Sequence, residues 1–215
     1  MRRMPDEKTP GERLLVGLSR IGTVLRNQAW RETSPRGMNP TQAQSLAFLA
    51  RSQPLGARLT ELADQLAVTQ STASESVSAL ERKGLVERTR DPADGRAIRI
   101  TLTETGRSAA AGVEVWPDLL LEVVEDLDAQ EQGVLLRLIL KMIRGLQVRG
   151  EIPPHRMCVT CTHFRPHVHD DPELPHHCAF VDAPFGDRQL RVDCLEHAPA
   201  GDAEEATWSA FVSRG

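Results

Sequence analysis

The stretch LTELADQLAVTQSTASESVSALERKGLVERTRDPADGRAIRITLTETG, residues 59–106, contains the pattern that decides the fold. Residues 59–68 and 69–84 have the apolar spacing of two short helices, and a glycine ends the second of them. Residues 85–90 and 97–102 then alternate apolar and polar side chains, as two strands with one solvent-facing side do. The turn-forming sequence DPADG joins these strands into a hairpin. Two short helices followed by a hairpin predict a winged helix-turn-helix.

Further helices are expected on both sides of this core. Residues 38–54 have helical patterning with Pro40 in the first turn, and a helix that begins after Thr103 is expected to continue past Trp116. The sequence DAQE at 128–131 has the spacing of a capping box and opens another helix. The fold class is therefore mainly α with a β-hairpin wing. An amino-terminal helix is indicated by apolar residues at spacings of four, three and four, namely Leu14, Leu18, Ile21 and Leu25.

The same core resembles the DNA-binding domain of the multiple-antibiotic-resistance regulator (MarR) family. DGRAIRITLT, residues 94–103, matches the Asp-x-Arg wing tip of that family followed by a strand that ends in Leu-Thr. SALERKGLVER, residues 78–88, matches the end of its recognition helix and its first wing strand. The resemblance covers about residues 11–149. It implies a regulator that binds a double-stranded DNA operator and forms a homodimer through interlocking terminal helices.

The resemblance also implies which residues contact DNA. Arg96 is the wing arginine expected to enter the minor groove, and Asp94 either orients that region or is a plain turn residue. Glu75 departs from the family, which often has a basic residue there; it could accept from a cytosine but is expected mainly to repel phosphate. Arg88 is interpreted as an ordinary solvated strand residue. The predicted DNA-binding residues are Gln70, Ser71, Thr72, Ser74, Arg90, Asp94, Arg96 and Arg99.

All four cysteines lie in one segment near the carboxyl end of the sequence. CVTCTHFRPHVHDDPELPHHC spans residues 158–178, and residues 1–157 contain no cysteine. A Cys-x-x-Cys pair followed by two single cysteines can supply four thiolates, which suit tetrahedral Zn²⁺ or an iron–sulfur cluster. The predicted ligands are Cys158, Cys161, Cys178 and Cys194.

The spacing favours the cluster over zinc. Structural zinc domains usually contain two tight cysteine pairs, whereas only the first pair is tight here. The pattern CVTCTHF…HHCAFVDAPFG…VDC resembles the cluster-binding part of high-potential iron–sulfur proteins. That resemblance implies a four-iron, four-sulfur (4Fe-4S) cluster, shielded from water by Phe164, Phe180 and Phe185. Zn²⁺ is the alternative, and His177 is the histidine best placed to substitute for a cysteine ligand.

These patterns divide the chain into a winged-helix and dimerisation domain, 1–149, and a small metal-bound cysteine domain, 150–215. The second carries 5 basic and 11 acidic residues, so it is not expected to bind DNA. The basic amino terminus is not followed by an apolar signal region, and no run reaches the ~18–20 apolar residues of a membrane span. A cytoplasmic protein with reduced thiols and no membrane partner is therefore expected.

The predicted function is a transcriptional regulator whose operator affinity responds to the state of the iron–sulfur cluster. One alternative is a MarR-type repressor with a structural zinc that responds to a small-molecule effector. A second alternative is a metalloenzyme that uses the winged helix as a scaffold. The enzyme is disfavoured because four cysteine ligands leave no open coordination position. The sequence also contains no Ser-His-Asp, Walker or dinucleotide signature.

Overall fold

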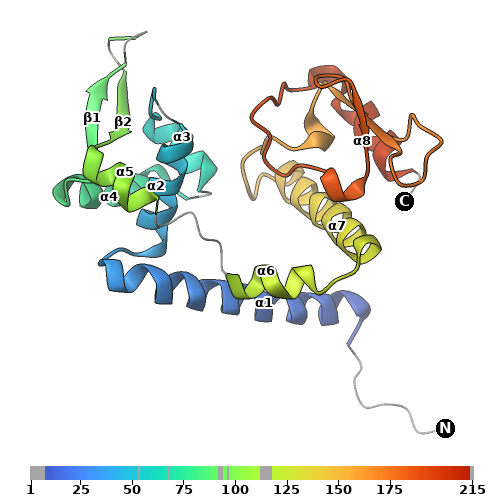
Figure 1. Ribbon diagram of the computed structural model, residues 1–215, viewed down its shortest axis with the longest axis horizontal. Helices are drawn as coiled ribbons and strands as arrows, with labels where there is room; N and C mark the ends of the chain where they lie inside the picture. Colours follow the sequence, from blue (N-terminus) through green and yellow to red (C-terminus); the bar gives the residue numbers. More distant parts are fainter. Residues whose placement is uncertain are drawn as a thin grey trace, which may run out of the picture. The chain divides into compact units, whose positions relative to one another are not determined.

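The chain divides into two compact units. The computed structural model describes residues 8–52, 54–66, 68–91, 94–95, 97–111 and 118–213. Its units are Met1–Glu122 and Val123–Gly215, coloured blue to green and yellow to red in Figure 1. The sequence placed the boundary at residue 149 instead. The compact units divide earlier because helix α7 (Ala129–Val148) packs its buried Leu140 into the same hydrophobic cluster as the cysteine-bearing segment.

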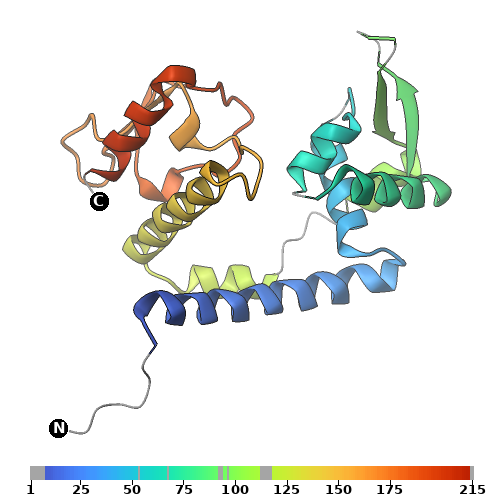
Figure 2. The same ribbon diagram turned by 180° about the vertical axis from the view of Figure 1, so that it is seen from behind.

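The first unit is a winged helix, as predicted. Strands β1 and β2 pair antiparallel, with Val86 opposite Leu102 and Arg90 opposite Ile98. In Figures 1 and 2 this hairpin extends beyond the helices of the unit. In chain order the elements are α1 (Pro10–Thr33), the 3₁₀ turn η1 (Ser34–Arg36), α2 (Pro40–Arg51), α3 (Leu59–Gln65), α4 (Gln70–Arg82), β1 (Val86–Arg90), β2 (Ile98–Leu102) and α5 (Glu104–Ala110).

Local side-chain chemistry sets several helix ends in this unit. Thr69 caps α4 by accepting a hydrogen bond from the Thr72 N–H, and Thr103 caps α5 in the same way. Gly84 follows α4 with a φ of 67°, a left-handed backbone that glycine adopts without steric cost. Helix α5 ends at Ala110, so the continuation past Trp116 expected from sequence falls on residues 112–117, outside the described part of the chain.

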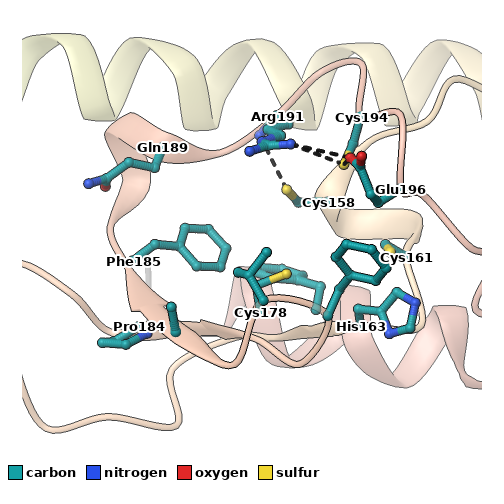
Figure 3. A pocket seen from close by; sticks show the side chains of 14 residues that line it. Cys158, Cys161, His163, Cys178, Pro184, Phe185, Gln189, Arg191, Cys194 and Glu196 are labelled. Atoms are coloured by element: carbon teal, nitrogen blue, oxygen red, sulfur yellow. Dashed lines mark hydrogen bonds and ion pairs between the residues drawn. The ribbon is translucent and has the colours of Figure 1, made fainter.

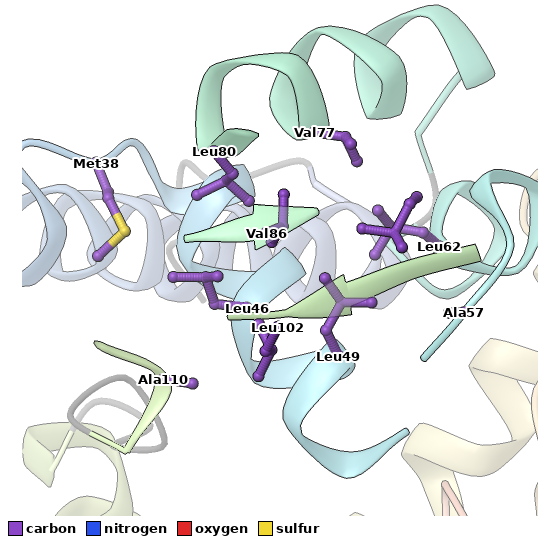
Figure 4. Close-up of a cluster of buried hydrophobic side chains, with 11 residues drawn as sticks. Met38, Leu46, Leu49, Ala57, Leu62, Val77, Leu80, Val86, Leu102 and Ala110 are labelled. Carbon is purple, nitrogen blue, oxygen red and sulfur yellow. The ribbon is translucent and has the colours of Figure 1, made fainter. Parts of the chain in front are cut away.

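The core of the first unit lies where α2, α4 and the hairpin meet (Figure 4). The helices α2 and α4 are amphipathic, and each buries one apolar face against the other. Burial of these side chains holds α4 and the hairpin in a defined relation. The buried cluster consists of Met38, Leu46, Leu49, Ala57, Leu62, Val77, Leu80, Val86, Ile100, Leu102 and Ala110.

The second unit is built around α7 and a small three-stranded antiparallel sheet in the order β3-β4-β5. Helix α6 (Asp118–Glu125) spans the division between the units. The remaining elements of the unit are η2 (Cys158–Thr160), β3 (Phe164–Arg165), β4 (His176–Cys178), β5 (Ala183–Phe185), η3 (Asp187–Gln189), η4 (Gly201–Ala203) and α8 (Glu204–Val212).

The two faces of α7 differ in burial. Asp128 and Glu131 form the predicted capping box at its start. One face, with Gly133 and Leu140, is buried in the second unit. The buried cluster of that unit comprises Leu140, Met157, Val159, Cys161, Phe164, Leu190 and Phe211. The other face exposes a stripe of apolar side chains, namely Val134, Leu135, Leu138, Ile139, Met142 and Leu146.

Among the described residues, no helix combines the length and the apolar character that crossing a lipid bilayer requires.

Candidate metal centre and candidate nucleic-acid interface

All four cysteines line a single cavity of about 330 Å³ in the second unit (Figure 3). Cys158 and Cys194 are far apart in sequence, and the fold brings them together with Cys161 and Cys178. The cavity wall also contains the three phenylalanines expected to shield a cluster, Phe164, Phe180 and Phe185. The structure therefore groups the predicted ligands in one largely apolar pocket.

Short elements place each sulfur. Cys158 opens η2 and Cys161 follows it, with the Cys161 N–H donating to the Cys158 carbonyl over 3.0 Å. Cys178 ends β4, the central strand of the small sheet. The N–H of Cys194 donates to the carbonyl of Arg156 over 2.9 Å. Backbone hydrogen bonds or strand pairing thus hold every cysteine in the pocket.

Arg191 contacts two of the sulfurs. Its backbone N–H donates to Sγ of Cys158 over 3.2 Å, and its guanidinium Nη1 donates to Sγ of Cys194 over 3.5 Å. Glu196 lies 3.7 Å from the same guanidinium. Arg191 therefore supplies a positive charge and two hydrogen bonds where thiolates would carry negative charge.

Without a bound group, the surroundings of Cys158 favour its protonated thiol. Burial raises the pKa of the Cys158 thiol to about 11, although the hydrogen bond from Arg191 opposes the shift. A thiophilic metal or cluster would have to displace this proton on binding.

The pocket offers four thiol sulfurs to a metal group. Among the described residues, which include every cysteine and histidine, no three His, Cys, Asp or Glu side chains are placed to hold a single metal ion. A zinc ion would need its thiolates at about 2.3 Å. The four sulfurs line a cavity of about 330 Å³, and the chemistry of this donor set fits Zn²⁺ and an iron–sulfur cluster alike.

The histidine nearest the pocket is not the expected one. His177 was the predicted substitute ligand, but its Nδ1 lies 3.2 Å from Nε2 of His169, and its Nε2 lies 3.2 Å from Asp182. His163 lines the cavity instead. The alternation of strand β4 turns His177 and Cys178 to opposite faces, which explains the difference.

The recognition helix α4 exposes the predicted DNA-contacting residues of its first turn. Gln70, Ser71 and Thr72 are exposed and Ser74 is half-buried. Oγ1 of Thr72 also lies 3.0 Å from Oγ1 of Thr69, so part of its hydrogen-bonding capacity serves the helix cap. Ser71, Ser74, Glu75, Ser78 and Arg82 lie along one face of α4.

The base of the wing contains an ion-pair network that the sequence did not reveal. The carboxylate of Asp91, 2% exposed, lies 2.8 Å from Nε of Arg99 and 3.1 Å from Nη2 of Arg58. Arg99 also donates to the Gly56 carbonyl over 3.0 Å. Arg99, predicted to bind DNA, therefore anchors the wing. Asp94 lies 3.8 Å from Arg58, which is compatible with its expected orienting role.

The other wing arginines differ in their surroundings. Arg88 donates to Glu81 over 2.9 Å and to Ser78 over 3.2 Å, as an ordinary surface residue does. Arg90 is exposed at the end of β1. Arg96 lies outside the described residues, so its minor-groove role stays a prediction.

Comparison with known proteins agrees with this geometry. A MarR family model matches residues 36–97, which include helices α2 to α4 and the first strand of the wing, β1. The HTH-type transcriptional repressor Rv2887 of Mycobacterium tuberculosis is 33% identical over 97 residues, which are 45% of this chain and 68% of the repressor. The chain belongs to the MarR family.

Other relatives of this MarR family member are also described as regulators. The HTH-type transcriptional regulator YxaD of Bacillus subtilis is 33% identical over 88 residues, 40% of this chain. That match spans 62% of the length of YxaD. The transcriptional regulator HosA of Escherichia coli is 29% identical over 106 residues, 49% of this chain and 78% of HosA. These relatives are regulators rather than enzymes, as the sequence predicted.

Solved structures share the MarR fold. The Staphylococcus aureus MepR–DNA complex is 24% identical with a TM-score of 0.56, covering 60% of this chain and 94% of MepR. CouR of Rhodococcus jostii, solved with p-coumaroyl-CoA, is 24% identical with a TM-score of 0.54, covering 69% of this chain and 98% of CouR. The four cysteines lie outside residues 36–97, so the family match does not describe their pocket.

In this MarR family member, Glu75→Gln is expected to strengthen binding to all DNA sequences alike. Glu75 is exposed on the same face of α4 as Ser71 and Ser78, where its carboxylate would repel phosphate. Parallel titrations of an operator and a random duplex measure the effect. Glu32→Gln, which removes the same charge from an exposed position on α1, serves as the control. A change of roughly 1–3 kcal/mol confined to one base pair would instead mean that Glu75 reads a cytosine.

Proposed function

We propose that the chain is a homodimeric DNA-binding regulator whose operator affinity responds to a 4Fe-4S cluster held by Cys158, Cys161, Cys178 and Cys194. The observation that carries the cluster assignment is the shared cavity, which all four cysteines of the chain line. The cysteine spacing, in which only the first pair is tight, favours a cluster over a single zinc ion.

DNA binding rests on family membership and on the exposed polar face of α4. Gln70, Ser71 and Thr72 present side chains that can meet phosphates and base edges in a major groove. The wing is held by the buried Asp91, which gives Arg90 a defined position beside it. The fold likeness to MepR, solved in complex with DNA, supports the same use of these elements.

Dimerisation would cover two apolar stripes. On α1, Leu14 and Leu15 are each 68% exposed, and Leu18 and Ile21 continue the stripe. On α7, Leu138 is 49% exposed among its apolar neighbours. Contiguous apolar surface of this kind marks an interface, and a second copy of the chain is the partner that the family relationship supports.

A bound 4Fe-4S cluster would supply a one-electron redox centre. The residues of the pocket would ligate it, shield it with phenylalanine rings, and donate hydrogen bonds from Arg191 to two sulfurs. One face of α7 packs through Leu140 on the hydrophobic cluster that includes Cys161 and Phe164 of the pocket wall, and the other face exposes the apolar stripe. A change in the pocket could therefore alter the dimer and the separation of its recognition helices.

Purification without oxygen tests this proposal. We expect a brown protein with about four irons and four sulfides per chain, since these compose the cluster. It should sediment as a dimer. The operator affinity of this form should differ from that of protein stripped of iron by a chelator, with a DNA duplex of unrelated sequence as control.

Three results would contradict the proposal in separate parts. Colourless protein with one zinc per chain would replace the cluster by a structural zinc. A monomer at working concentration would remove the dimer. Equal operator affinity with and without iron would leave a cluster that is not the signal.

A further inference from the structure

We propose that the connecting segment, Asp187–Arg191, couples the cysteine pocket to helix α7. Arg191 is tied to two cysteine sulfurs at one end, and Asp187 and Arg188 are tied to α7 at the other. The inference rests on the proposed cluster function, because it names the residues through which the pocket would reach the dimer helix.

The pocket end of the segment is held by both the backbone and the side chain of Arg191. Its N–H donates to Sγ of Cys158 over 3.2 Å, while its carbonyl accepts from the N–H of Cys158 over 3.0 Å. Its guanidinium reaches Sγ of Cys194. A change in the charge or position of these sulfurs acts directly on Arg191, because hydrogen bonds to charged sulfur are stronger than those to neutral thiols.

The other end of the segment binds α7 through hydrogen bonds and an ion pair. Nη2 and Nε of Arg188 lie 2.9 and 3.2 Å from the amide oxygen of Gln132. Asp187 lies 3.6 Å from Nη1 of Arg137 and 2.9 Å from Nε2 of the buried His176. Burial opposes ionisation of Asp187, yet the hydrogen bond from His176 and the nearby Arg137 keep its pKa below the ordinary value.

The contact between the segment and α7 is close. A Cβ added at Gly133 would lie 3.3 Å from Cβ of Asp187 and 3.5 Å from Cγ of Arg188. The absence of a side chain at Gly133 therefore lets the segment lie directly on the helix.

The segment is also short and internally fixed. It contains the 3₁₀ turn η3, and Leu190 is 5% exposed in the hydrophobic cluster that includes Leu140 of α7. At its start, the Gly186 N–H donates to the side-chain oxygen of Gln189 over 2.8 Å. Close-packed elements transmit a displacement rather than absorb it, so movement at Arg191 should reach α7.

The test compares Arg188→Ala and Gln132→Ala with wild type in cluster-loaded and iron-free forms. Arg188 is exposed and Gln132 half-buried, so both variants should fold and keep their colour. We expect the ratio of the two operator dissociation constants to be on the order of 5–150 in wild type and to fall below about 3 in each variant. Gln132→Ala also removes the hydrogen bonds that Nε2 of Gln132 donates to the carbonyls of Val124 and Leu127. The double variant should therefore lower the ratio no further than Gln132→Ala alone, because that variant already lacks the contact with Arg188.

Arg165→Ala is the matched control, since this exposed arginine of β3 donates to carbonyls of its own neighbourhood and should keep the wild-type ratio. Hydrogen exchange of the α7 amides provides a readout independent of DNA. Iron removal should raise the exchange rate of the α7 amides in wild type. In Arg188→Ala these amides should exchange faster than in wild type even when the cluster is bound.

Either of two results would overturn the coupling while leaving the proposed function intact. One is a wild-type ratio of operator dissociation constants in both variants. The other is hydrogen exchange of the α7 amides that does not change when iron is removed from wild type. Equal affinities of the two wild-type forms would overturn both.

Discussion

Cys161→Ser is expected to abolish the brown colour and the iron content of anaerobically purified protein. Cys161 is 7% exposed and belongs to the buried cluster of the second unit. Serine oxygen is a harder and less acidic donor than thiolate sulfur, so it should not replace the ligand in this apolar pocket. Thr162→Ser, a conservative change at the next residue, should leave colour and iron unchanged.

The same variant should loosen the second unit without unfolding the first. Limited proteolysis should cut the segment after α7, because a bound metal centre contributes folding energy to a small domain. Fragments that contain the winged helix should remain resistant, because their buried cluster is separate. Retention of full iron content by Cys161→Ser would remove Cys161 from the ligand set.

Asp91→Ala is expected to lower the free energy of unfolding of the winged-helix unit by about 3 kcal/mol. Removing one partner of a buried ion pair typically costs about 3–5 kcal/mol, and the lower end applies because Arg58 is 42% exposed. Arg99 is 18% exposed, so its guanidinium would lose its principal partner in a poorly solvated place. Operator affinity should fall as well, because the base of the wing loses its anchor.

Asp94→Ala provides the control for this prediction. The Asp94 side chain is 50% exposed and 3.8 Å from Arg58, so its removal should cost less than about 1 kcal/mol. Urea denaturation followed by circular dichroism measures both variants, and titration with a duplex operator measures affinity. Equal losses of unfolding free energy in the two variants would mean that the burial of Asp91 does not determine its contribution to stability.

The winged helix could be predicted from sequence because its signals are local. Helical and strand periodicities, the capping residues and the turn before Asp94 each depend on neighbours within a few residues. The pattern therefore predicted the order of helices and the hairpin, which the structure confirms. The cysteines could likewise be assigned to one site, because all of them lie in one segment that could fold on itself.

Contacts between distant residues were decided only by the tertiary structure. Asp91 appears in sequence as one acid of a turn, and its importance arises from Arg58, 33 residues away. The arginine pattern of the wing did not separate Arg99, which anchors, from Arg90, which is exposed. Side chains that share one charge differ in role according to which partners the fold brings near them.

The boundary between the two compact units was likewise decided only by the tertiary structure. The MarR resemblance placed α7 with the dimerisation helices, and the apolar stripe of α7 that contains Leu138 and Leu146 is exposed. The opposite face, with Gly133, Arg137 and Leu140, packs against the cysteine-bearing segment and places α7 in the second compact unit. Sequence periodicity indicates that a helix has an apolar face. A face that mixes glycine, arginine and leucine has no such pattern, and whether it is buried depends on a complementary surface that only the folded chain supplies.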